Sequence, residues 1–160
     1  MKLTLSVVLL LVAQWTGFAQ TVPADKELLE QGAGAGMGSY ADLNGYPGPK
    51  HVLEMRDTLR LTDEQEKDIE AIFDGMSETA RAKGELVIAK EQELNARFKN
   101  GTVTEPEIRR LAGEIGKLRG DLRAVHLTAH VQTRQILTKQ QIALYNTIRH
   151  KASHHAPGSH

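Results

Sequence analysis

The chain has 160 residues, and its 20 basic and 20 acidic residues give a formal net charge of zero. This balance gives no electrostatic reason to expect nucleic acid or an anionic membrane as a partner. Only 4% of the residues are aromatic, so aliphatic side chains supply most of the apolar mass, which favours long helices over a β-sandwich or barrel. The lack of cysteine excludes disulfides and thiol chemistry.

Residues 1–19 have the pattern of a secretory signal peptide. Met1 and Lys2 form a short basic start, residues 3–12 are apolar, and small residues precede a cleavage site at Gln20. The alternative, an uncleaved anchor, is disfavoured because the apolar run is shorter than the roughly 20 residues that a membrane span needs. We therefore expect a soluble exported protein, periplasmic in a cell with two membranes.

Residues 20–47 are rich in glycine and proline, with a glycine run at 32–38. Such residues raise the entropy cost of ordering the chain and break helices. We predict a flexible arm here, with one or two helical turns at most, followed by a helical domain over residues 48–150.

A short helix is predicted from Pro49 to about Arg60, followed by a long helix that begins at Leu61-Thr62-Asp63-Glu64-Gln65. In this motif the Thr62 oxygen can accept from the backbone of Gln65, whose side chain reaches back to the cap residue. Lys99-Asn100-Gly101 should end the long helix, because Asn and Gly adopt left-handed backbone readily. Its predicted apolar stripe comprises Ile69, Phe73, Met76, Ala80, Val87, Leu94 and Phe98.

A second long helix is predicted to begin at the Thr104-Glu105-Pro106-Glu107 cap and to follow an apolar heptad pattern to Ile136. The last helix, from Thr138 to about Lys151, begins at a second copy of the motif, Leu137-Thr138-Lys139-Gln140-Gln141. Residues 151–160 are predicted to form a flexible, His-rich tail.

These elements predict an all-α protein of four helices, in which the two long helices form an antiparallel hairpin flanked by short ones. A lone hairpin is too thin to bury both apolar stripes. We therefore expect a cradle-like homodimer with a curved face of apolar and basic residues. The alternative is a monomeric four-helix bundle.

The two Leu-Thr-x-x-Gln copies, with residues Leu61, Thr62, Gln65, Leu137, Thr138 and Gln141, resemble the Spy/CpxP family, also called the LTXXQ family. The resemblance covers residues 48–150. It implies a periplasmic helical dimer that works without ATP, shielding unfolded client proteins or reporting envelope stress to a membrane-bound sensor kinase or regulator.

The chain is also similar to the CnrX/ZraP-type heavy-metal sensor and resistance proteins. That resemblance implies ligand pairs one helical turn apart, matched here by His51/Met55 and His126/His130, and a carboxylate from Glu70 or Asp74. The metal would be Zn²⁺ or another divalent transition metal such as Ni²⁺, Co²⁺ or Cu²⁺, although no cofactor is required by the pattern. Arg134 departs from it, because a cation stands where a sensor has a ligand.

Other interpretations of these residues remain open. Met55 lies on an apolar stripe and fits a core position, because methionine commonly fills gaps there. His126 adjoins a heptad position and fits an exposed site or a bond to a neighbouring helix.

No catalytic constellation appears in the sequence: the carboxylates alternate with basic residues at helical spacing, and the glycine run lacks the features of a phosphate-binding loop. We expect a binding protein and no enzyme. Its predicted function is to bind partly unfolded proteins on an amphiphilic helical surface, with metal binding as the alternative. Basic residues that could attract acidic client segments are Arg109, Arg110, Lys117, Arg119 and Arg123.

Overall fold

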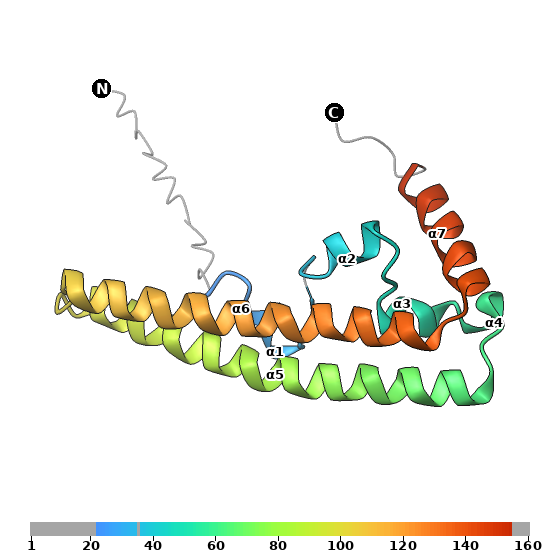
Figure 1. The fold of residues 1–160 in the computed structure, drawn as a ribbon. Helices are drawn as coiled ribbons and strands as arrows, with labels where there is room; N and C mark the ends of the chain where they lie inside the picture. The colour runs from blue at the N-terminus through green and yellow to red at the C-terminus, as the bar shows by residue number, and fades with distance from the viewer. Residues whose placement is uncertain (1–21, 35, 155–160) are drawn as a thin grey trace, which may run out of the picture.

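The computed structural model describes residues 22–34 and 36–154, and this part of the chain is helical without strands (Figure 1). The predicted signal peptide and residues 155–160 of the predicted tail lie outside the described residues. The all-α prediction is confirmed for the part that is described. Its helices are α1 (Lys26–Glu30), α2 (Ser39–Leu43), α3 (Pro49–Glu54), α4 (Arg56–Leu59), α5 (Asp63–Lys99), α6 (Glu105–Ile136) and α7 (Lys139–His154).

The long helices α5 and α6 lie side by side as an antiparallel hairpin (Figure 1), as predicted. Helix α5 begins with the predicted capping box: the Gln65 N–H donates to Thr62 Oγ1 at 3.2 Å, and the Thr62 N–H donates to Gln65 Oε1 at 3.1 Å. It ends before Gly101, whose φ of +65° is left-handed. At the start of α6, the Glu107 carboxylate accepts from the Thr104 N–H and hydroxyl. Local signals thus set the ends of the hairpin helices.

Two apolar clusters hold other elements against the hairpin. Near the motifs, Tyr145 of α7 and Val52 of α3 are fully buried in a cluster completed by Leu59, Ile69 and Leu137. Further along the hairpin, the second cluster comprises Leu29, Ala80, Val87, Ile88 and Leu122. Burial of these side chains in each cluster supplies the main favourable free energy for docking the short helices.

The predicted helix count of four is wrong, because seven helices are present in the described residues. The short helix expected from Pro49 to Arg60 is divided at Met55, whose backbone leaves the helical region at φ −108° and ψ 14°. Its N–H donates to the carbonyl of Val52, three residues back, so the helix tightens and ends there. Arg60 then takes a left-handed backbone, φ 52°, that closes α4.

The arm contains short helical turns, as the prediction allowed, and its flexibility remains a prediction. It contributes α1 and α2, and it packs against the hairpin with Leu29 only 2% exposed. Composition suggested a high entropy cost of ordering, but the glycines also let the arm backbone approach α6 closely. Gly32 and Gly45 have positive φ angles of 64° and 76°, so they permit turns that other residues strain to adopt.

Several large apolar side chains remain exposed. Phe98, placed on the predicted apolar stripe of α5, is 56% exposed, and Leu86 on the same helix is 54% exposed. Helix α7 continues to His154, beyond the predicted end at Lys151. Within residues 22–34 and 36–154, none of the helices combines the length and the apolar character that a membrane span requires. The expected homodimer remains a prediction.

Candidate functional site

The two Leu-Thr-x-x-Gln motifs meet in space through their glutamine side chains. Gln65 Nε2 donates to Gln141 Oε1 at 3.0 Å, and Gln141 Nε2 donates to Gln65 Oε1 at 2.9 Å. Each glutamine also caps its own helix, because its Oε1 accepts from the N–H of the motif threonine, Thr62 or Thr138. The capping role predicted for both motifs is confirmed.

Each glutamine also satisfies backbone carbonyls at the end of another helix. Gln65 Nε2 donates to the carbonyl of Ile136 at 2.9 Å, and Gln141 Nε2 donates to that of Leu59 at 3.3 Å. The last carbonyls of a helix have no partner within it. The pair therefore ties the ends of α4 and α6 to the starts of α5 and α7, and we call Gln65 and Gln141 the glutamine lock. Its role is structural, because both amides use their donors and acceptors on the protein itself.

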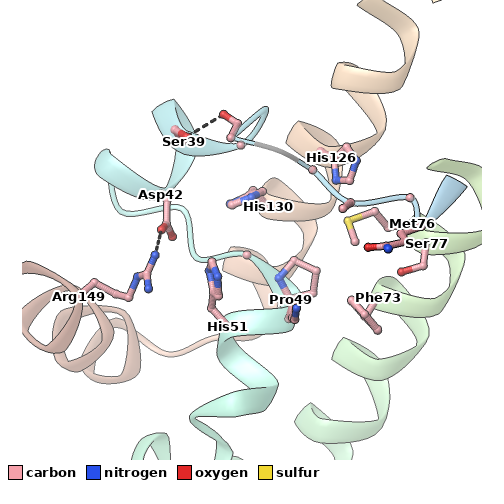
Figure 2. Close-up of a pocket in the computed structure, with 18 residues that line it drawn as sticks. Ser39, Asp42, Pro49, His51, Phe73, Met76, Ser77, His126, His130 and Arg149 are labelled. Carbon is pink, nitrogen blue, oxygen red and sulfur yellow. Dashed lines mark hydrogen bonds and ion pairs between the residues drawn. The ribbon is translucent and has the colours of Figure 1, made fainter. Parts of the chain in front are cut away.

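A cavity of about 460 Å³ lies between the arm, α3 and the hairpin (Figure 2). Polar and apolar side chains from five helices, α2 among them, reach it. They include His51 of α3, Phe73, Met76 and Ser77 of α5, His126 and His130 of α6, and Arg149 of α7.

His126 and His130 lie one turn apart on α6 beneath the glycines of the arm. A Cβ on Gly34 would lie 3.2 Å from His126 Nδ1, and a Cβ on Gly38 would overlap His130 Nε2. A side chain at either position would press on a ring, so glycine allows this approach without a shift of the imidazole. The predicted ligand pair is thus covered by arm backbone.

The two imidazoles have different hydrogen-bond partners. His130 Nδ1 lies 2.6 Å from the carbonyl of Tyr46, which only accepts, so Nδ1 carries the proton and donates. His126 is 5% exposed, and its Nε2 has no hydrogen-bond partner among the described residues. Burial, with a smaller contribution from the charge on His130, lowers the pKa of His126. A neutral His126 therefore offers a buried lone pair or N–H that no group in the described part of the chain satisfies.

At the rim of the cavity, Asp42 of the arm joins α2 to α7. Arg149 donates to its Oδ2 at 2.9 Å (Figure 2). The hydroxyl of Tyr145 donates to its Oδ1 at 2.7 Å. Burial of Asp42 opposes its ionisation, but the bonds from Tyr145 and Arg149 outweigh burial and lower its pKa. Burial and the bond to Asp42 raise the pKa of Tyr145. His51 lies beside this cluster, and burial followed by the charge of Arg149 lowers its pKa.

The motif pair decides the family. A family model described as LTXXQ motif family protein matches residues 48–149, which include both motifs and the glutamine lock. The chain belongs to the LTXXQ motif family. This family includes the periplasmic proteins of Spy/CpxP type, so the predicted family is confirmed. No curated protein and no solved structure matches the chain.

Within this LTXXQ family domain, the candidate metal ligands are only partly brought together. His51, His126 and His130 line the cavity, whereas Met55 packs against the apolar cluster near the motifs. Glu70 and Asp74 are exposed and are not part of the cavity lining, where α5 presents Phe73 and Met76 instead. Among the described residues, no three His, Cys, Asp or Glu side chains gather in a way that could hold a metal ion.

Arg134, which departs from the ligand pattern of the metal sensors, contacts the arm. Its Nε donates to the carbonyl of Gly45 at 3.1 Å, and its guanidinium lies 4.6 Å from the centre of the Tyr46 ring.

Two features of the cavity were not predicted. The cluster of Asp42 with Tyr145 and Arg149 joins residues more than a hundred positions apart, which no local pattern indicates. The covered histidines do have a signal, since Gly34 and Gly38 share the spacing of four found in His126 and His130.

Proposed function

We propose that this LTXXQ family protein is an exported, ATP-independent binding protein of Spy/CpxP type that holds partly unfolded polypeptides on the surface of the α5–α6 hairpin. The proposed role is non-catalytic and periplasmic. Family membership and the signal-peptide pattern of residues 1–19 support the compartment.

The observation that carries this proposal is the set of large apolar side chains that the hairpin leaves exposed. Leu86 and Phe98 of α5 are 54% and 56% exposed, and Val131 of α6 is 44% exposed. Exposed apolar groups spread among charges allow weak, reversible contacts with apolar segments of many sequences.

The charges around these side chains are largely balanced within the hairpin. Arg110 pairs with Glu114 and Glu93, Lys90 pairs with the same two carboxylates, and Lys117 pairs with Asp121. Such exposed pairs contribute little to stability and exchange readily with other charged groups. They can therefore orient a charged client, while the apolar side chains supply the contact area.

The proposal is tested by light scattering of dithiothreitol-reduced insulin with the mature protein at equimolar dose. Suppression of scattering is expected, and the double variant Leu86→Ser/Phe98→Ser should lose most of it while keeping its helical circular dichroism. Leu43→Ser is the matched control, because Leu43 is 71% exposed but lies on the arm. Unchanged scattering with the wild-type protein would contradict the proposed function.

A second candidate function is binding of a transition metal, and the unpartnered Nε2 of His126 favours it. A neutral imidazole nitrogen is a ligand for Zn²⁺, Ni²⁺, Co²⁺ and Cu²⁺. His126 and His130 share a helix face, and His51 borders the same cavity, so these are the residues that would hold the ion. The arm backbone over both α6 rings would have to shift for His130 Nε2 to bind as well.

Calorimetric titration with each of the four metals tests this alternative. The tail histidines, His150, His154, His155 and His160, are replaced by alanine so that they do not contribute heat. Heat that disappears in His126→Ala and His130→Ala variants supports an internal site. Heat that is absent, or unchanged by both substitutions, rejects it.

We also propose that the protein acts as a homodimer, because the exposed apolar side chains of a slender hairpin favour a second copy as cover. Sedimentation equilibrium at several concentrations tests this directly. A membrane-bound sensor kinase or regulator remains a proposed partner on the basis of the family resemblance alone.

A further inference from the structure

The groove between α5 and α6 is occupied along part of its length by the arm. Leu29 of α1 is 2% exposed and packs with Ala80, Val87 and Ile88 of α5 and Leu122 of α6. Helix α1 has only five residues, and isolated helices of this length are not stable in water. The groove therefore shapes the segment that occupies it.

Gly84 provides a notch in the floor of this groove. A Cβ at this position would overlap the carbonyl oxygen of Leu29, at a separation that real Cβ atoms do not reach. Glycine in the middle of a helix lowers helix propensity, so its presence here has a local cost. The notch lets the backbone of an incoming segment, and not only its side chains, approach α5.

A charged group marks one end of the groove. Arg119 of α6 donates to both carboxylate oxygens of Asp25 at 2.7 and 3.1 Å, and also to Glu91 of α5 at 2.9 Å. The hydrogen bonds from Arg119 lower the pKa of Asp25, and those to Asp25 and Glu91 raise the pKa of Arg119. A planar guanidinium with paired bonds recognises a carboxylate with defined geometry. Asp25 and Leu29 are four residues apart, so one helical turn presents both to the hairpin.

The occupant lies outside the family domain, whereas the groove lies within it. The family match begins at residue 48, so it includes Gly84, Arg119 and Leu122 but not Asp25 or Leu29. The groove is thus part of the hairpin within the family domain, and the arm is a separate segment that fits it.

We propose that this groove is a docking site for a partner polypeptide segment that carries a carboxylate four residues before a leucine, and that the arm occupies the site as an intramolecular competitor. Leucine fills the space between Val87 and Leu122, the carboxylate pairs with Arg119, and the backbone passes over Gly84. The inference rests on the proposed function, since it states which kind of client segment the groove of the hairpin would bind. Binding of a client segment in this groove, unlike contact with the exposed side chains of the hairpin, then requires displacement of the arm.

The experiment uses a fluorescein-labelled synthetic peptide of residues 22–34 and the mature chain, with binding followed by fluorescence anisotropy. In the wild-type protein the tethered arm competes at high effective concentration, so the peptide should bind weakly. Leu29→Asn in the protein removes the anchor of the arm, and peptide affinity should rise by about tenfold or more. Leu28→Asn is the matched control, because Leu28 is 42% exposed on the same helix.

Two further measurements locate the binding to the groove. Adding Gly84→Leu to the Leu29→Asn protein should abolish peptide binding, because the new side chain fills the notch. A peptide that itself carries Leu29→Asn should bind neither the wild-type protein nor the Leu29→Asn protein. If Leu29→Asn loses helical circular dichroism, Asp25→Asn replaces it, with a smaller rise in affinity expected. No rise in affinity, or binding that survives Gly84→Leu, overturns the inference.

The scattering assay separates this inference from the proposed function. Peptide binding by Leu29→Asn without suppression of insulin aggregation would support the docking site and reject the chaperone role. Suppression by the wild-type protein that Leu29→Asn does not increase, together with no gain in peptide affinity, would support the role and reject the site.

Discussion

The two ends of the hairpin are stabilised by different kinds of contact. At the motif end, α3, α4 and α7 share an apolar cluster with Ile69 of α5, and Val52, Ile69 and Tyr145 are fully buried. At the loop end, beyond about residue 90, the described chain provides only α5 and α6, and Phe98 is 56% exposed. One pair of helices is thus locked at one end and left accessible at the other.

At the loop end, ion pairs flank a narrow apolar seam in which Leu111 is fully buried and Ile115 is 8% exposed. Lys90 bonds to Glu93 and Glu114, Arg110 bonds to the same carboxylates, and Arg97 lies 3.7 Å from Glu107. Exposed pairs of this kind contribute little because salt screens them and the side chains lose entropy. Amide protons of residues 90–110 should therefore exchange with solvent faster than those of residues 62–75, measured by hydrogen exchange.

The largest expected effect comes from breaking the glutamine lock. Gln141→Ala removes the side-chain half of the α7 capping box, the amide pair with Gln65 and the bond to the carbonyl of Leu59 at the end of α4, so the free energy of unfolding should fall by about 2–3 kcal/mol. Urea unfolding followed by circular dichroism measures it. Gln140→Ala is the matched control, because Gln140 is exposed in the same motif.

A double-mutant cycle sharpens this test. Gln65→Ala and Gln141→Ala should be non-additive, because each substitution already breaks the amide pair. Full additivity would show that the two motifs act only as separate helix caps, and coupling between the glutamines would then contribute nothing to the contrast between the two ends of the hairpin.

The second effect concerns the bond between α7 and the arm. Tyr145→Phe keeps the buried ring but removes the hydroxyl that donates to Asp42 at 2.7 Å. The free energy of unfolding should fall by about 1.5 kcal/mol, because the acceptor is a charged carboxylate. Thermal or urea unfolding measures the loss, and Tyr40→Phe, at a ring that is 68% exposed, should leave stability unchanged.

The arm and the histidines show what the sequence could and could not predict. The caps at Thr62 and Thr138 and the turn at Gly101 were predicted because each is encoded within a few neighbouring residues. The meeting of Gln65 with Gln141, and the burial of His126 beneath Gly34, depend on chain segments far apart in sequence. Periodicity within a single helix carries no information about them.

Composition indicates only part of how the arm behaves, for a physical reason. Glycine has two effects: it raises the entropy lost on folding, and it allows backbone to approach another element closely. The sequence shows only the first effect. The second becomes evident when Gly34 and Gly38 lie against His126 and His130, and when Gly84 lies against Leu29.

The free energy of unfolding should also depend on pH, through the histidines of the cavity beneath the arm. The pKa of His126 is lowered in the fold mainly by burial, so between that value and the ordinary pKa of 6.5 the unfolded chain binds more protons than the folded one. Stability should therefore fall as the pH drops from about 7 to about 5, since folding favours the neutral ring. His51 contributes in the same direction.

Midpoints of urea unfolding, measured between about pH 7 and about pH 5, check the direction of this change. The variant His126→Leu should show a weaker dependence of stability on pH. Asp42 adds a separate loss at lower pH, because its lowered pKa stabilises the fold only while the carboxylate is ionised. Stability that rises on acidification between pH 7 and 5 would contradict the burial of neutral His126 beneath the arm.

The smallest expected effect comes from replacing single glycines of the hairpin, Gly116 in open space and Gly84 beneath the arm. Gly116 lies inside α6, and a Cβ added there would meet nothing within 4 Å, so Gly116→Ala should raise the free energy of unfolding by about 0.5–1 kcal/mol through helix propensity alone. Gly84→Ala gains the same propensity, but its new Cβ clashes with the carbonyl oxygen of Leu29. The free energies of unfolding of the two variants, measured with urea, should therefore change in opposite directions. Equal stabilisation would mean that the arm leaves the groove at little cost, and the accessible part of the hairpin would then extend from the loop end to the arm.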